Sequence, residues 1–262
     1  MGELEPWSSR ELIHLANIRG TLSADSARSL KRPEIAHQID KALEDSYDVE
    51  SAEELLLVTL MPDDSGSMNG SKQNSVIDGH NWLLSKMASS GSSKNIMLQT
   101  RYLNGQVLNP FSPLSDCQEL SFENYQCNLG TPLFEQTLVT LGTVMAKTEE
   151  VADVSERVRT ATLIMTDGQA TDKNASVLKA EVASVVKDMR RVGDHIVAGM
   201  GFTIVKDDHA VYDVFEEMGI KAEYIFPARD REQVLRAFRI FGESAIAELT
   251  AGRSNVRRVF EG

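Results

Sequence analysis

Five residues in three separated segments have the chemistry to bind one divalent metal ion. The segments lie at 63–67, 130–132 and 166–168, and they supply two carboxylates and three hydroxyls, from Asp63, Asp167, Ser65, Ser67 and Thr131. Such hard oxygen donors suit Mg²⁺, which takes about six oxygens in a near-octahedral shell. Mn²⁺ and Ca²⁺ also favour oxygen, so the donors alone do not select among the three metals. These segments contain no obvious pair of nucleophile and base, and the sequence therefore predicts metal-dependent binding and not an enzyme.

The two carboxylates follow segments with the character of buried strands. Near-continuous apolar runs at 55–61 and 160–166 are typical of strands covered on both faces of a sheet. Asp63 comes just after the first run, beyond Pro62, and Asp167 directly follows the second. Ligands bind at the carboxyl ends of strands in open parallel sheets, so we expect the two carboxylates to meet if the strands are neighbours.

The three hydroxyls should come from a tight loop and from the start of a helix. Gly66 lets the backbone turn, so that Ser65 and Ser67 can converge on one point. Thr131 and Pro132 predict a helix start, with Thr131 as the N-cap and Pro132 at the first helical position. Its place at a helix terminus would let Thr131 add a hydroxyl from a second loop.

Strand-like and helix-like patterns alternate through most of the chain. Further strands are predicted at 95–103, 195–204 and 222–226, and helices at 72–89, 174–191 and 208–218, from 131 onwards and from about 230 onwards. This alternation implies crossover connections and a doubly wound, mostly parallel α/β sheet. Asn104-Gly105 lies between two strand-like runs and predicts a hairpin, which would make one edge strand antiparallel.

The regions outside this alternation have a different character. Residues 1–53 are predicted to form a polar helical arm or linker, broken or kinked at Pro33, that packs on a main domain at 54–250. Residues 251–262 are predicted to form a C-terminal tail with a short basic run, which we interpret as solvated. A long loop at about 110–130 holds both cysteines, Cys117 and Cys127, for which free thiols and a bridge are both open.

Composition indicates which cellular compartment and which classes of binding partner suit the protein. The chain has 262 residues and a formal net charge of −12, which disfavours nucleic-acid backbones and anionic membranes as partners. No apolar run approaches the ~20 residues of a membrane span, and the first residues match neither a secretory signal nor a myristoylation site. The low cysteine content predicts a cytoplasmic protein.

The pattern Asp63-x-Ser65-x-Ser67, Thr131 and Asp167 resembles the metal-ion-dependent adhesion site of the von Willebrand factor A domain family, over about residues 54–247. The resemblance implies a Rossmann-like fold that holds one divalent cation. It also implies that the serines ligate the ion directly, that the aspartates act directly or through water, and that the threonine contact depends on conformational state. An open coordination position would take an Asp or Glu carboxylate of a protein partner. The sequence names no partner and fixes no oligomeric state.

Some details depart from the family pattern or refine it. Pro62 and Asp64 flank the first aspartate where apolar residues are commoner, and the extra charge of Asp64 would favour Ca²⁺ or weaken the binding of an acidic ligand. The segment 165–172 resembles stand-alone bacterial cytosolic members, including those linked to tellurite resistance and stress. Asp64 and Asp172 are otherwise expected to be solvated loop acids. Gly199-x-Gly201 lies inside a predicted strand and is too short for a phosphate-binding fingerprint.

Two other functions fit parts of the pattern. Paired acids after a strand also occur in Mg²⁺-dependent phosphotransfer domains of the receiver and phosphatase types. However, the phosphatases require a second aspartate where Ser65 stands, and a receiver requires a lysine that only Lys206 approximates. The third hypothesis is a scaffold whose metal site is vestigial and whose N-terminal arm makes the contacts.

Overall fold

The computed structural model describes residues 7–49, 52–168, 170–203 and 208–250. Within them, a six-stranded sheet has the order β3-β2-β1-β4-β5-β6. Its strands are β1 Ala52–Pro62, β2 Ile96–Arg101, β3 Val107–Pro113, β4 Ser155–Thr166, β5 His195–Phe202 and β6 Ile225–Ala228. Neighbouring strands are parallel except for β2 and β3. The predicted doubly wound, mostly parallel α/β fold with an antiparallel edge strand is therefore confirmed. The predicted tail at 251–262 and Lys206 lie outside the described residues.

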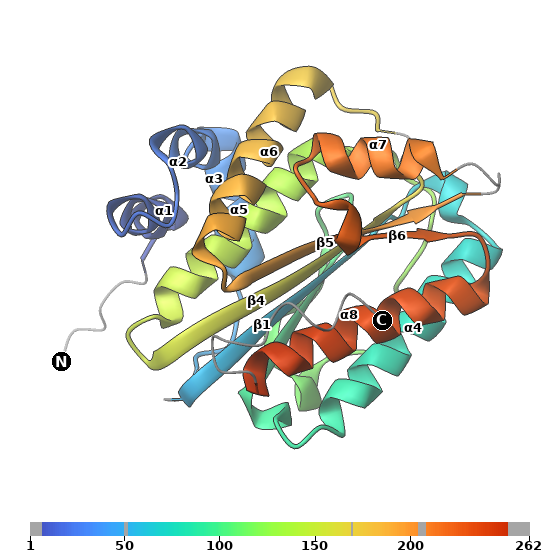
Figure 1. Cartoon of the computed structure of the whole chain (residues 1–262), viewed down its shortest axis with the longest axis horizontal. Helices are drawn as coiled ribbons and strands as arrows, with labels where there is room; N and C mark the ends of the chain where they lie inside the picture. The colour runs from blue at the N-terminus through green and yellow to red at the C-terminus, as the bar shows by residue number, and fades with distance from the viewer. Residues whose placement is uncertain (1–6, 50–51, 169, 204–207, 251–262) are drawn as a thin grey trace.

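Helices cover both faces of this Rossmann-like sheet (Figure 1). One face carries α4 (Ser71–Ala88) and α8 (Arg231–Thr250), and the other carries α5 (Leu133–Val151), α6 (Ala175–Val192) and α7 (His209–Glu217). Side chains along a strand point alternately to the two faces. In β1, Leu55 and Leu57 accordingly join one hydrophobic core, while Leu56 and Val58 join the other. Burial on both faces explains why this strand is a continuous apolar run.

Three N-terminal helices pack against the outside of α5 and α6 (Figure 1). They are α1 (Ser9–Ile18), α2 (Ala24–Leu30) and α3 (Pro33–Leu43), so the predicted break falls at the first residue of α3. The packing is close, because a Cβ atom added at Gly142 in α5 would lie 2.4 Å from Ile39 Cδ1. Their buried apolar side chains belong to the same hydrophobic core as those of α5, α6 and α7.

Several predicted boundaries shift in the structure. The loop expected from 110 is shorter, because β3 continues to Pro113 and a 3₁₀ turn follows at Leu114–Asp116. The last strand starts at Ile225, after another 3₁₀ turn at 222–224. Cys117 and Cys127 are both free thiols.

The two glycines of the Gly199-x-Gly201 pattern allow α7 to pack on β5. An added Cβ would lie 2.4 Å from the Phe215 ring at Gly199 and 2.2 Å from Val211 Cγ1 at Gly201. Close helix–strand approach therefore accounts for these glycines.

Among the described residues, no helix combines the length and the apolar character needed to cross a membrane.

Candidate metal-binding site

The first carboxylate lies where β1 and β4 end side by side. Pro62 pairs with Met165 in the parallel register, and Asp63 N donates to Met165 O at 3.0 Å. The Asp63 side chain is fully buried. Its Oδ1 accepts a hydrogen bond from Ser65 N at 2.8 Å, and its Oδ2 accepts one from Thr166 Oγ1 at 2.7 Å. The two strands are thus neighbours, as the meeting of Asp63 and Asp167 requires.

The serine loop is held against the second segment of the predicted site. Ser65 Oγ and Ser67 Oγ lie 3.0 Å apart, with Ser65 buried and Ser67 exposed. Ser65 forms an isolated parallel bridge with Leu129, and Gly66 N donates to Leu129 O at 3.2 Å. These backbone contacts place the two hydroxyls beside the chain that leads into Thr131.

Thr131 does not cap the helix that follows it, and this prediction is wrong. Helix α5 begins at Leu133, and Pro132 is its N-cap with a ψ of 62°. The cap is provided instead by Asp172, whose carboxylate accepts hydrogen bonds from Phe134 N at 3.2 Å and Glu135 N at 2.9 Å. Asp172 is therefore a structural residue and not a solvated acid.

Thr131 is instead tied to Thr171, which lies three residues after the third segment. Its backbone N–H donates to Thr171 Oγ1 at 3.1 Å, and its carbonyl accepts from Thr171 N at 2.8 Å. The residue is 3% exposed, and its hydroxyl has no hydrogen-bond partner among the described residues. The side chain is thus buried close to the other segments, with its oxygen available to a ligand.

Asp167 shares its carboxylate with a lysine that the sequence analysis missed. Lys72 Nζ donates to Asp167 Oδ2 at 3.1 Å and to the Ser67 carbonyl at 3.2 Å. The other oxygen, Asp167 Oδ1, is buried and has no hydrogen-bond partner among the described residues. Burying a carboxylate oxygen without a hydrogen bond costs folding free energy, and a bound cation or a hydrogen-bond donor at this atom would remove that cost.

The extra aspartate of the loop has a structural role. Asp64 is 2% exposed, and its Oδ1 accepts a hydrogen bond from Asn104 N at 3.1 Å. Its carbonyl accepts from Asn128 N and Leu129 N. The expectation of a solvated acid is wrong, because the loops at 104 and 128 fold against this residue.

Burial makes the negative charge of this loop unfavourable. It raises the pKa of Asp63, the charge of Asp167 raises it further, and the hydrogen bonds from Ser65 and Thr166 oppose the shift. Burial also raises the pKa of Asp64 to about 6. A bound cation would stabilise the ionised form of both carboxylates.

The donor set fits a hard cation that binds through hydroxyls as much as through carboxylates. Within the described ranges, no three His, Cys, Asp or Glu side chains cluster in a way that could hold a metal. The predicted site is of another kind, since three of its five donors are hydroxyls. The structure brings the three segments of this set together through Ser65–Leu129, Thr131–Thr171 and Asp63–Thr166 contacts.

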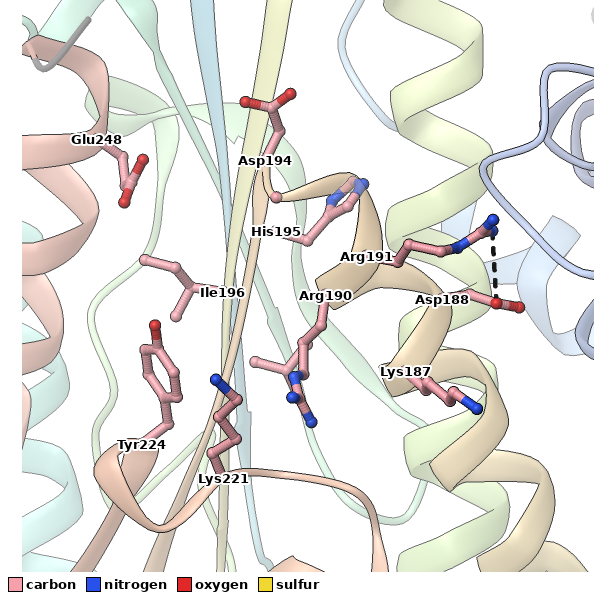
Figure 2. A pocket seen from close by; sticks show the side chains of 12 residues that line it. Lys187, Asp188, Arg190, Arg191, Asp194, His195, Ile196, Lys221, Tyr224 and Glu248 are labelled. Atoms are coloured by element: carbon pink, nitrogen blue, oxygen red, sulfur yellow. Dashed lines mark ion pairs between the residues drawn. The ribbon is translucent and has the colours of Figure 1, made fainter. Parts of the chain in front are cut away.

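A cavity of 430 Å³ lies at the N-terminal end of the sheet, and Figure 2 shows the side chains that line it. It borders the amino end of β5 and the carboxyl end of α6. Its three acidic residues already have partners: Asp188 pairs with Arg191 in Figure 2, Asp194 pairs with Arg157 at 2.6 Å, and Glu248 lies 3.9 Å from Arg159. None of the five predicted metal-binding residues lines this cavity, so it is separate from the predicted metal site.

Comparison with known proteins supports the fold. No protein-family model matches the chain, and no curated protein matches its sequence. The pilus adhesin SpaC from Lactobacillus rhamnosus GG is similar in structure, with a TM-score of 0.52 and 12% identity over 78% of this chain and 31% of SpaC. Proximal thread matrix protein 1 from the mussel byssus is similar with a TM-score of 0.50 and 10% identity, over 73% of this chain and 48% of the mussel protein. This chain spans less than half of either protein, and at these identities the likeness shows the fold alone.

Proposed function

We infer that this protein is a divalent-metal-dependent protein-binding module. The supporting observation is that three distant segments meet at the C-terminal ends of the strands, where Asp167 Oδ1 is buried and has no partner in the described part of the chain. The Asp63, Ser65, Ser67, Thr131 and Asp167 side chains would hold the ion, which we propose to be Mg²⁺, with Mn²⁺ and Ca²⁺ as chemically similar substitutes.

The chemistry of the donors favours binding over catalysis. Two carboxylates offset a charge of +2 only if both contact the ion directly, and hydroxyls add no charge. When bound, the cation would supply a positive centre that an Asp or Glu of a protein partner can approach. Ser67 and Gly66 are exposed, so the serine loop is open to such a partner. A cavity of 280 Å³ that borders Asp167 leaves further room beside the ion.

We also propose that the protein belongs with the von Willebrand factor A domain family, among its stand-alone bacterial cytosolic members. The order of the motifs and the doubly wound sheet both support it. The two free thiols fit a reducing compartment, which supports a cytoplasmic location.

The test is metal-dependent capture of partners. The full chain, immobilised, is exposed to native lysate with Mg²⁺ or with EDTA, and bound proteins are identified by mass spectrometry. We expect a set of proteins that binds only with Mg²⁺, that Ser67→Ala fails to capture and that Ser71→Ala retains. Ser71 is a matched control, because it is an exposed serine four residues away in α4. Identical sets with Mg²⁺ and EDTA would refute the proposal.

A further inference from the structure

Lys72 places a positive charge inside the candidate metal site. It belongs to the first turn of α4, where the helix dipole disfavours a cation. Its ammonium group nevertheless reaches across to the third segment, with Nζ 3.1 Å from Asp167 Oδ2, and it also contacts the Ser67 carbonyl of the first segment. The Lys72 side chain is 24% exposed and that of Asp167 is 5% exposed. The acidic site, and not the helix, explains where this side chain lies.

The ammonium group lies beside the Asp167 carboxylate, which a divalent ion would need as a ligand. It satisfies one oxygen of Asp167 and leaves the other, Oδ1, without a partner among the described residues. The fully buried Asp63 has no cationic side chain in contact with it within the described ranges, since its two oxygens accept from Ser65 N and Thr166 Oγ1. Lys72 therefore neutralises the site only in part.

We propose that Lys72 is a tethered cation that holds Asp167 in the metal-free site and gives way when a divalent ion binds. The inference rests on the proposed metal-binding function and adds a determinant of its affinity. A divalent ion repels the ammonium group, and the repulsion is large in a partly buried site with a low effective dielectric constant. Metal uptake thus includes the cost of breaking the Lys72–Asp167 ion pair.

Isothermal calorimetry with Mg²⁺ on the full chain tests this cost. Lys72→Met should bind Mg²⁺ about tenfold more tightly than the wild type, or better, because neither the ion pair nor the repulsion remains. Lys72→Arg keeps the charge and should stay near the wild-type affinity. Lys86→Met is the matched control for lost charge, since Lys86 is an exposed lysine in the last turn of the same helix.

The possible results separate this inference from the function on which it rests. Equal Mg²⁺ affinities for the wild type and Lys72→Met would overturn the role of Lys72 and leave the metal site standing. Absence of Mg²⁺, Mn²⁺ and Ca²⁺ binding in both proteins would overturn both. Tighter binding by Lys72→Met and Lys86→Met alike would assign the effect to net charge and also overturn the inference.

A second readout uses the unaltered protein. Acetylation of lysines by a water-soluble ester is followed by peptide mass spectrometry, with and without saturating Mg²⁺. Lys72 should react several-fold faster with Mg²⁺, because its amine leaves Asp167 and becomes more accessible to the reagent, while the rate at Lys86 stays the same. An unchanged Lys72 rate under conditions where calorimetry shows Mg²⁺ binding would contradict displacement.

Discussion

Individual side chains at the sheet edge divide into those that hold the loops and those that are left for a ligand. Asp64 and Asp172 accept backbone hydrogen bonds and fix the conformation of two loops. The Thr131 hydroxyl and Asp167 Oδ1 accept no backbone hydrogen bond within the described part of the chain. A buried oxygen that makes no hydrogen bond within the fold is one kind of donor that we expect a metal to use.

This division predicts opposite effects for two substitutions. Asp172→Ala should destabilise the protein by about 1 kcal/mol, as the loss of a helix cap does, and should leave Mg²⁺ affinity within a few-fold of the wild type. Thr131→Ala should change stability much less and weaken Mg²⁺ binding at least tenfold. Urea unfolding and calorimetry measure the two quantities. A Thr131→Ala variant that loses stability but binds Mg²⁺ normally would show that the hydroxyl is structural.

How far the sequence predicts the site depends on how local each interaction is. The motif order and the strands before Asp63 and Asp167 are local signals, and they identify the residues that meet at the edge. The wrong N-cap at Thr131 has a non-local cause, since the cap comes from Asp172, some 40 residues later. Lys72 was missed for a similar reason, because its partner Asp167 is 95 positions away. Only its position five residues after Ser67 could have drawn attention to it.

The helices and strands set the geometry within which the site forms. The apolar runs and the Asn104-Gly105 hairpin predict the sheet well. Strands buried on both faces and tight turns each depend on a few consecutive residues, so short stretches of sequence are enough to identify them. The packing of the N-terminal helices is harder to predict, because it depends on a small residue in a distant helix. Gly142 in α5 leaves the space that Ile39 of α3 fills.

Substitution of Gly142 tests whether α3 is part of the stable fold. Gly142→Ala places a methyl group 2.4 Å from Ile39 Cδ1, and we expect a loss of about 1–3 kcal/mol in the free energy of unfolding. Gly91→Ala is the control, because it meets open space at a glycine with no positive φ. Ile39→Val removes the clashing Cδ1 atom, so the double variant should lose less than the sum of the two single variants. Full additivity would mean that α3 does not pack on α5 as described.

The global stability of the molecule depends on pH through buried histidines. Burial lowers the pKa of His195 to about 4, against an ordinary value of 6.5. The unfolded chain therefore takes up a proton at a higher pH than the folded chain. The stabilisation by neutral His195 is complete above about pH 6.5 and is lost as the pH falls towards 4.

Comparison of His195→Gln with the wild type isolates this contribution. The loss of unfolding free energy between pH 7 and pH 5 should be about 2 kcal/mol smaller in the variant, which has no group to protonate there. The difference between proteins removes the effect of carboxylates that titrate in the same range. His14→Gln, at an exposed position in α1, should behave as the wild type does. An unchanged pH dependence in His195→Gln would contradict the assignment.

The central claim is that one divalent cation binds between the three segments at the carboxyl edge of the sheet. A crystal of the full chain grown with Mn²⁺, examined by anomalous diffraction, tests it most directly. We predict one strong peak bonded to the hydroxyls of Ser65 and Ser67, close to Thr131, Asp63 and Asp167, with Lys72 moved off Asp167. A well-ordered site without a peak, or a peak only elsewhere on the molecule, would contradict the account.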